Sequence, residues 1–272
     1  MNTGHQNLHT HTTYCDGKLT APQMVKAAIE KGGGSLGFSE HSFVPFDEEY
    51  SMALSDMPSY IQEINSLKTQ YADKIDIFLG IEQDYFTNTI PKGMDYIIGS
   101  VHHVEHDGKD ITIDGSYEHL QTVRDEHFGG DFLAVAEAYY AQTAKVAQKT
   151  NASIIGHFDL IAKQNAGGRL FDEKNPRYVR AATDAMECIL EKCRLFEVST
   201  GAMYRLGKAE PYPSIFLLKE LFRRKGEVIL SSDSHDAASL YYKFDEMREL
   251  LKSCGFKRIK RLTKNGFADE ML

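Results

Sequence analysis

The segment NLHTHTTYCDG, residues 7 to 17, contains the first side chains in this sequence whose types and spacing could perform chemistry. Its β-branched residues and the closing Asp16-Gly17 turn pair predict a β-strand. In a strand, His9 and His11 are two residues apart and therefore point to one face. Two imidazoles followed by the carboxylate of Asp16 could ligate a metal ion. A solvent-facing polar strand would show the same pattern, so the rest of the sequence has to decide between the two interpretations.

Similar side chains recur where other predicted strands end. Apolar strands are predicted over residues 35–41, 75–84, 94–103, 153–159, 195–201 and 227–235. At or near their carboxyl ends lie His41, Glu82, His102, His157, Asp233 and His235. The carboxyl ends of the strands in a βα barrel meet at one mouth, so these side chains should converge with the first group.

Helical patterns alternate with these strands. Helices are predicted from Thr20, which has capping-box spacing to Gln23, to about Gly32, and over residues 58–71, 132–149, 176–193, 213–225 and 238–253. Near-continuous apolar strands that alternate with helices are typical of a parallel sheet covered by helices. About seven such units without a break in composition predict a closed or nearly closed α/β barrel, formed by residues 1–272 as a single domain. The irregular stretch 104–130 is predicted to be a functional loop.

Composition and charge exclude several classes of protein. With 42% hydrophobic residues among 272, the chain can form a packed core. Its net charge of −8 argues against general nucleic-acid binding, and the basic run KRIKR at residues 257–261 is predicted to be a solvated surface strand. No apolar run approaches ~20 residues, so no membrane span is expected.

The N-terminus lacks the features of a secretory signal, so a cytoplasmic location is expected. The four cysteines, Cys15, Cys188, Cys193 and Cys254, form no CxxC pair and are predicted to be reduced thiols. Cys15 lies close to the first histidines, where it could instead be a ligand or a nucleophile.

Six histidines and three carboxylates gathered at one mouth would be costly to bury without a cation, because of desolvation and like-charge repulsion. Divalent ions remove both costs. Imidazole and carboxylate ligands without thiolate suit Zn, Mn or Fe better than Mg or Ca. Nine ligands are too many for one ion and suit two or three ions that share a bridging carboxylate. Clustered metal ions favour hydrolysis, particularly of phosphate esters.

In this order, the segments HTH…D, SEH, GIEQD, SVHH, GHFD and SDSH resemble the PHP (polymerase and histidinol phosphatase) family, and within it the stand-alone histidinol-phosphate phosphatases. The resemblance spans residues 7 to 235. It implies a distorted (β/α)7 barrel, three divalent metal ions, and hydrolysis of L-histidinol phosphate in histidine biosynthesis. Many members of the family have histidine at the position of Asp16, which leaves open the metal preferred there.

The resemblance also implies how the ligands are shared. One ion would be held by His9, His11, Glu82 and Asp233. Glu82 would bridge to a second ion, which His102 and His157 complete. The third would be held by Asp16, His41 and His235. Glu82 and Asp233 would therefore be catalytic residues as well as ligands.

Candidate substrate contacts lie on loops after the predicted strands. Arg169 and Arg205 should lie at the same mouth, where a guanidinium matches the geometry of phosphate, although a surface salt bridge is the alternative for each. His103 should point away from the ligands if its strand continues, but it could reach the substrate and protonate the leaving alkoxide. Ser199 and Tyr117 are candidate wall residues.

Three functions remain open at this stage. A phosphomonoesterase acting on the small molecule L-histidinol phosphate is favoured by the complete ligand set and the arginine loops. Another PHP-type phosphoesterase, acting on nucleotides or nucleic-acid ends, would be expected to carry a basic groove or an inserted domain. A non-catalytic module would be expected to have lost ligands, and none is missing. No nucleic-acid or membrane partner is expected, and the oligomeric state is left open.

Overall fold

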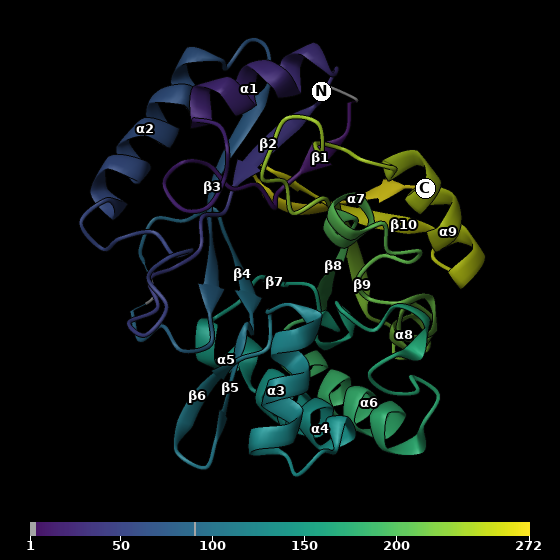
Figure 1. Cartoon of the computed structure of the whole chain (residues 1–272). Helices are drawn as coiled ribbons and strands as arrows, with labels where there is room; N and C mark the ends of the chain where they lie inside the picture. Colours follow the sequence, from purple (N-terminus) through teal and green to yellow (C-terminus); the bar gives the residue numbers. More distant parts are fainter. Residues whose placement is uncertain (1–3, 90) are drawn as a thin grey trace.

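The computed structural model describes residues 4–89 and 91–272 of the chain. Its centre is a seven-stranded sheet in the order β1-β2-β3-β4-β7-β8-β9, in which every neighbouring pair is parallel. The strands are β1 (Gln6–Asn7), β2 (Ser35–Phe38), β3 (Asp76–Asp84), β4 (Tyr96–Ser100), β7 (Ile154–Ile155), β8 (Leu195–Ser199) and β9 (Glu227–Ser231). Figure 1 shows them as a ring with helices around its outside.

The edges of this sheet meet where β9 returns to β1. The side-chain amide of Asn7 donates to Ser232 Oγ (2.9 Å) and accepts from the Ser232 backbone N–H (3.0 Å). Beyond β1, the His11 N–H donates to the Ser234 carbonyl (2.8 Å), and the Ser234 N–H donates to the His9 carbonyl (3.0 Å). These bonds nearly close the barrel, which confirms the predicted (β/α)7 architecture. They also align two segments that carry predicted ligands.

Helices cover the outside of the barrel. They include α1 (Ala21–Glu30), α2 (Met57–Gln70), α4 (Phe132–Thr143), α5 (Val146–Thr150), α6 (Pro176–Leu190), α8 (Ile215–Arg223) and α9 (Phe244–Cys254). The capping interaction predicted for α1 is present, because Gln23 Oε1 accepts a hydrogen bond from the Thr20 N–H (2.9 Å). The single helix predicted over 132–149 is divided into α4 and α5. Within the described part of the chain, no helix is both long and apolar enough to span a bilayer.

Several local predictions were wrong. The strand predicted over 153–159 is confined to Ile154–Ile155. The opening strand is confined to Gln6–Asn7, because the chain turns soon afterwards: the Thr12 carbonyl accepts from the N–H groups of both Cys15 and Gly17 (3.0 Å each). The stretch 104–130 is not a loop. It forms the hairpin β5 (His103–His106) and β6 (Lys109–Thr112), followed by helix α3 (Tyr117–His127). The hairpin turn at Asp107 and Gly108 has positive φ at both residues (50° and 71°), as the Asp-Gly pair favours.

The predicted surface strand at KRIKR is confirmed as part of β10 (Arg258–Thr263), which pairs antiparallel with β11 (Gly266–Met271). Leu262 of β10 belongs to an apolar cluster with side chains of the central strands. The Gln6 side chain bonds to both the N–H and the carbonyl of Leu262 (2.7 and 3.0 Å). The hairpin therefore packs against the amino-terminal end of the barrel, opposite the end at which the ligands were predicted.

Tyr96 occupies the barrel interior beneath that mouth. Its hydroxyl donates to the carbonyl oxygens of Phe38 (2.9 Å) and Leu8, which belong to neighbouring strand ends. The ring lies where a side chain at Gly80 would overlap it, so the absence of a Cβ at residue 80 makes room for the tyrosine. Because Leu8 precedes His9, this buried hydroxyl helps to hold the start of the ligand-bearing segment.

Candidate active site

Glu82, in strand β3 and 1% exposed, lies at the centre of the predicted ligand cluster. Its Oε2 faces His9 Nε2 (3.2 Å), His11 Nε2 (3.6 Å) and His41 Nδ1 (2.8 Å), and its Oε1 faces His102 Nε2 (3.4 Å) and His157 Nε2 (2.8 Å). These five histidines come from the ends of four different strands. A carboxylate whose two oxygens face separate groups of imidazoles is well placed to bridge two divalent ions.

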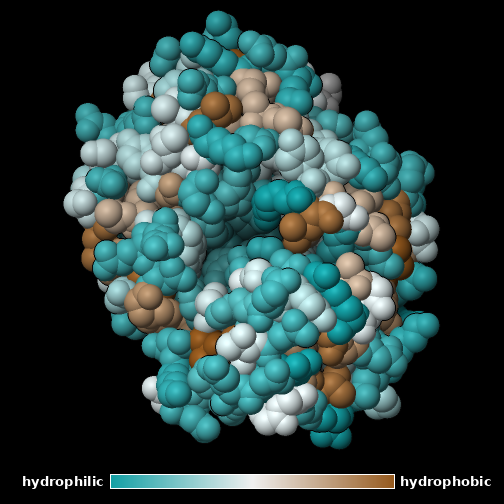
Figure 2. All heavy atoms as spheres, viewed as in Figure 1, coloured by the Kyte–Doolittle hydropathy of each residue, from teal (hydrophilic) through white to brown (hydrophobic). Residues whose placement is uncertain are grey.

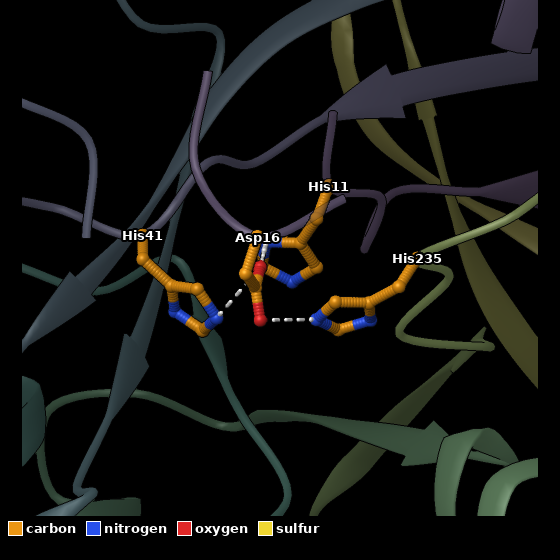
Figure 3. Close-up of side chains that lie close together, drawn as sticks. All are labelled: His11, Asp16, His41 and His235. Atoms are coloured by element: carbon orange, nitrogen blue, oxygen red, sulfur yellow. Dashed lines mark ion pairs between the residues drawn. The ribbon is translucent and has the colours of Figure 1, made fainter. Parts of the chain in front are cut away.

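A second group surrounds Asp16, which lies in the turn after the first histidines. Figure 3 shows its carboxylate among the rings of His11, His41 and His235. Asp16 Oδ1 lies 4.0 Å from His11 Nδ1 and 3.7 Å from His41 Nε2, and Oδ2 lies 3.1 Å from His235 Nε2. The chain thus brings together the residues predicted for the third ion.

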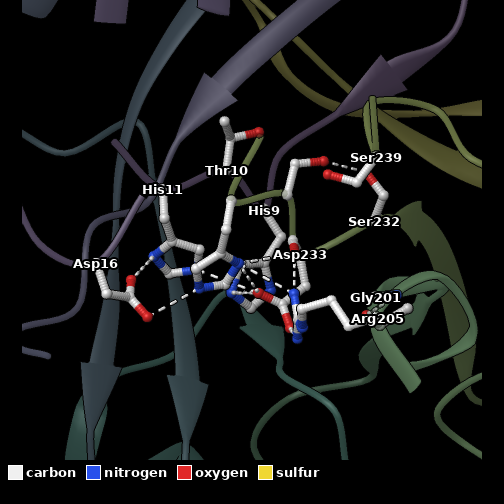
Figure 4. Close-up of polar contacts among 12 residues, drawn as sticks. His9, Thr10, His11, Asp16, Gly201, Arg205, Ser232, Asp233 and Ser239 are labelled. Atoms are coloured by element: carbon white, nitrogen blue, oxygen red, sulfur yellow. Dashed lines mark hydrogen bonds and ion pairs between the residues drawn. The ribbon is translucent and has the colours of Figure 1, made fainter. Parts of the chain in front are cut away.

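Asp233 completes the cluster from the segment that follows β9. It adopts a left-handed conformation (φ 45°), which aspartate tolerates better than most residues. Its Oδ1 lies 3.3 Å from His11 Nε2 and 3.6 Å from His9 Nε2, and its Oδ2 accepts a hydrogen bond from Arg205 (2.6 Å; Figure 4). A Cβ on Gly201 would lie 2.9 Å from the Asp233 Cβ, so only glycine permits this close approach.

The donor atoms of this cluster fit divalent ions. His9 Nε2, His11 Nε2 and Glu82 Oε2 are buried and have no hydrogen-bond partner within the described residues. Buried polar atoms in native proteins normally have partners, so unpartnered atoms require an explanation. Imidazole and carboxylate atoms from several groups of these residues lie within 4.8 Å of one another. Cations between them would satisfy atoms that the protein itself leaves without partners.

The protonation states of these side chains are set by burial and by neighbouring charges. Burial, together with the nearby rings of His41 and His235, lowers the pKa of His11 to about 3, so this imidazole is neutral at pH 7. Burial alone would raise the pKa of Glu82, but the surrounding imidazoles, His41 and His9 first, hold it well below its usual value. A neutral imidazole and an ionised carboxylate are the forms that bind metal ions.

A cavity of about 770 Å³ opens onto this cluster. Six predicted ligands are among the residues that line it: Asp16, His41, His102, His157, Asp233 and His235. Figure 2 shows this mouth as a hollow surrounded largely by hydrophilic residues. Its volume is typical of a site for a small molecule.

Arg205, on the short helix α7 (Gly201–Leu206), lines the cavity as predicted. Its guanidinium bonds to Asp233 Oδ2 and lies 3.0 Å from His235 Nδ1. Although burial opposes it, the charge of Asp233 raises the pKa of Arg205 above its ordinary value, so the guanidinium stays charged. A fixed cation therefore stands at the edge of the ligand cluster.

The other predicted substrate residues do not reach the cavity in this structure. Arg169 is exposed, because a turn with positive φ at Gly167 and Gly168 directs the chain outward before it. Its guanidinium bonds to Gln164 and lies 4.1 Å from the centre of the Tyr117 ring. Ser199 is fully buried, and its Oγ accepts from the Gly201 N–H (3.3 Å). Substrate contacts by Arg169, Tyr117 and Ser199 therefore remain predictions.

His103 was expected to point away from the ligands if its strand continued, but it lies on the cavity side. Strand β4 ends at Ser100 and the β5 hairpin begins at His103, so the strand does not continue through both histidines, and His102 and His103 both line the cavity. His103 Nε2 lies 3.0 Å from Asp47 Oδ2, and burial lowers the pKa of this imidazole. Its role as a general acid remains a prediction.

Several polar residues of the site were not identified from the sequence. Lys163 lines the cavity and pairs with Asp114 (2.5 Å). Two buried carboxylates, Glu197 and Asp84, each contact the outward-facing nitrogen of a candidate ligand. Glu197 could have been noticed as the one charged residue in the apolar strand LFEVS, and Asp84 as the acid two residues after Glu82.

Cys15, which was considered as a ligand or a nucleophile, is a thiol that donates to Glu40 Oε2 (2.8 Å). Burial and the neighbouring carboxylates of Glu40 and Asp16 raise its pKa well above the ordinary value. This environment suppresses the thiolate, which is the nucleophilic and metal-binding form of cysteine.

Comparison with known proteins agrees with this geometry. A "probable histidinol-phosphatase" of Deinococcus radiodurans is 28% identical over 268 residues, which cover 94% of this chain and 96% of that protein. A histidinol-phosphatase of Bacillus subtilis is 25% identical and is matched over 97% of its length and 89% of this chain. The histidinol phosphate phosphatase of Lactococcus lactis, solved with Zn, L-histidinol and phosphate, has the same fold (TM-score 0.73, 21% identity, 97% of this chain and 98% of that one). The PHP domain profile matches residues 7–201, which make up most of the chain and include seven of the nine candidate ligands, so the chain belongs to the PHP domain family.

Proposed function

We propose that this protein is a metal-dependent histidinol-phosphatase, which hydrolyses L-histidinol phosphate to L-histidinol and phosphate. The observation that carries the proposal is the buried Glu82 carboxylate, which faces five imidazoles, three of which (His41, His102 and His157) line a cavity of about 770 Å³. The named relatives match this chain over nearly their full lengths, which supports the same activity. Action in the cytoplasm, within histidine biosynthesis, is part of the proposal.

Three divalent ions, of Zn, Mn or Fe, would be held in the groups that the sequence suggested. The family resemblance implies three groups: His9, His11, Glu82 and Asp233; Glu82, His102 and His157; and Asp16, His41 and His235. In the structure, donor atoms of Asp16, His41 and His235 lie within 4.8 Å of one another and also of His11, and those of His41 lie equally close to Glu82 and His102. When bound, such ions activate water near neutral pH and neutralise charge on phosphoryl oxygens. Glu82 and Asp233 would then contribute to catalysis by holding these ions.

The remaining residues of the cavity bind and orient the ester. Arg205 is fixed by its bond to Asp233, so its guanidinium can hold a phosphate oxygen without first being ordered. Lys163 adds a second cation to the wall, and the carboxylates of Asp47 and Asp114 line the same space. A cavity with cations and carboxylates suits a substrate that carries both a phosphate and an amine.

Arg205→Ala should lower kcat/KM about 10- to 150-fold, because a charged hydrogen bond to phosphate is worth roughly 1.5–3 kcal/mol. Phosphate should also inhibit this variant more weakly. Elemental analysis must show full metal content, since Arg205 also contacts Asp233. Arg169→Ala is the matched comparison: an equal loss would show that Arg169 reaches the substrate, and wild-type kinetics would show that it is a surface residue. Unchanged phosphate inhibition in Arg205→Ala would disprove the proposed contact.

The proposed activity is tested by assaying the purified protein against a panel of phosphate esters. L-Histidinol phosphate should exceed p-nitrophenyl phosphate by a large margin in kcat/KM, because pocket walls that bind the amine and the imidazole improve only the former. AMP and a 5′-phosphorylated oligonucleotide complete the panel. A preference for either would support the nucleotide-directed alternative, and a flat profile would indicate a generic phosphoesterase.

A further inference from the structure

Glu197, at the centre of strand β8, is a buried carboxylate that is not one of the candidate metal ligands. It is 1% exposed, and its Oε2 lies 2.7 Å from His9 Nδ1, the ring nitrogen opposite the one that faces Glu82. The same Oε2 accepts from Ser231 Oγ (2.7 Å), and Oε1 accepts from the His157 backbone N–H (2.6 Å). One carboxylate thus contacts two candidate ligand residues.

Asp84 has the corresponding position behind His102. It is 2% exposed, and its Oδ2 lies 3.0 Å from His102 Nδ1, while His102 Nε2 faces Glu82. Its other oxygen accepts from the Phe86 backbone N–H (2.8 Å), which fixes the carboxylate. His9 faces Glu82 Oε2, and His102 faces Glu82 Oε1. Each oxygen of the central carboxylate therefore has one facing imidazole that is held from behind by a second carboxylate.

We propose that Glu197 and Asp84 are positioning residues, which hold His9 and His102 in the tautomer that presents Nε2 to the metal ions. This inference rests on the proposed metal centre. An ionised carboxylate can only accept hydrogen bonds, so each Nδ1 must carry a proton. In the neutral imidazole, which is the form that ligates a metal ion, Nε2 then carries the lone pair. A carboxylate behind a ligating histidine also makes the ring more basic and fixes its orientation.

If Glu197 had a purely structural role, zinc binding in its variants would follow a different pattern. Glu197 also joins β8 to β9 through Ser231, so its removal could loosen the barrel without acting on His9. Ser231→Ala deletes that strand contact and leaves the carboxylate beside His9 intact. It is therefore the matched control. Asp84→Asn supplies a second test on another strand, independent of whether Glu197→Gln folds.

The test is a zinc titration of the purified, metal-stripped proteins against a chromogenic chelator, with circular dichroism to verify the fold. Glu197→Gln and Asp84→Asn should each weaken the binding of one zinc equivalent about 10- to 100-fold, the usual effect of removing such a partner. Ser231→Ala should bind zinc as the wild type does. In nitrogen-15 spectra of the zinc-loaded wild type, His9 and His102 should show protonated Nδ1.

The outcomes separate this inference from the proposed function. If the wild type binds zinc tightly and the folded Glu197→Gln and Asp84→Asn variants bind it equally well, the positioning role is wrong while the metal centre stands. Equal weakening in Ser231→Ala and Glu197→Gln would also overturn the role of Glu197, because a strand contact alone would then account for the effect. If the wild type itself fails to bind zinc, the metal centre is wrong.

Discussion

Replacing Glu82 with glutamine should reduce kcat/KM for L-histidinol phosphate by several orders of magnitude and lower the bound metal. The wild-type carboxylate presents Oε2 to His9 Nε2 (3.2 Å) and Oε1 to His157 Nε2 (2.8 Å), one imidazole from each of the two ions it would bridge. A neutral amide has one oxygen and one NH2 group, so it can offer an acceptor to one side only. The bridge between two dications would therefore be lost on the other side.

Glu40→Gln is a suitable control for this experiment. Glu40 is equally buried and its carboxylate lies within 4.8 Å of donor atoms of His11 and Cys15, but it accepts hydrogen bonds from Thr12 and Cys15 and makes no ion pair with an imidazole among the described residues. It therefore tests whether neutralising any buried carboxylate beside the cluster has the same effect. We expect it to retain its metal, as measured by elemental analysis. Turnover near that of the wild type in Glu82→Gln, with full metal content, would show that Glu82 is not the bridging ligand.

Stripping the metal ions with a chelator should abolish hydrolysis and also lower the Tm. The ions bind the folded chain, so at a free concentration about 1000 times its Kd each ion stabilises the chain by roughly 4 kcal/mol. For a chain of this size, each bound ion therefore corresponds to roughly 8–16 °C in Tm. Differential scanning calorimetry of the stripped and reloaded protein measures the shift, and the activity assay is run on the same samples.

Reloading should restore both properties together. Glu82→Gln should show a smaller shift in Tm between its stripped and reloaded forms, because fewer ions bind. Phosphatase activity in a sample that elemental analysis shows to be free of metal would contradict the proposed mechanism. An unchanged Tm would show that the buried imidazoles and carboxylates do not depend on cations for their stability.

The architecture and the candidate ligands could be predicted from local patterns, because in a parallel sheet the position of a residue along its strand determines the end of the barrel at which it lies. Each apolar strand ends at the same edge, so a histidine or carboxylate at that point must lie at the mouth, whatever the details of the intervening helix. For this reason the sequence alone predicts that Glu82, His102 and His157 lie at the mouth. Although β1 is shorter than predicted, His9 and His11 lie where they were expected. Their backbone hydrogen bonds to Ser234 align them without a long strand.

Loop side chains were harder to place, because their directions depend on partners that are distant in the sequence. Arg169 follows a strand as Arg205 does, but a turn at residues 166–168 directs it outward and its guanidinium stacks on Tyr117, more than fifty positions earlier. Arg205 is drawn inward by Asp233, which follows a different strand. Nothing in the local composition around either arginine distinguishes these outcomes.

The roles of Glu197 and Asp84 likewise depended on tertiary structure. Each lies in an apolar strand, and the sequence shows only that a charged residue is present there. The partner of Glu197 is 188 residues away, and that of Asp84 lies just beyond the end of the neighbouring strand β4. Strand order and register decide which imidazole each carboxylate meets, since a hydrogen bond requires atoms to approach within about 3 Å. Residue types and strand ends were thus enough to predict a metal-binding mouth, whereas folding of the whole barrel decided which nitrogen of each histidine faces it.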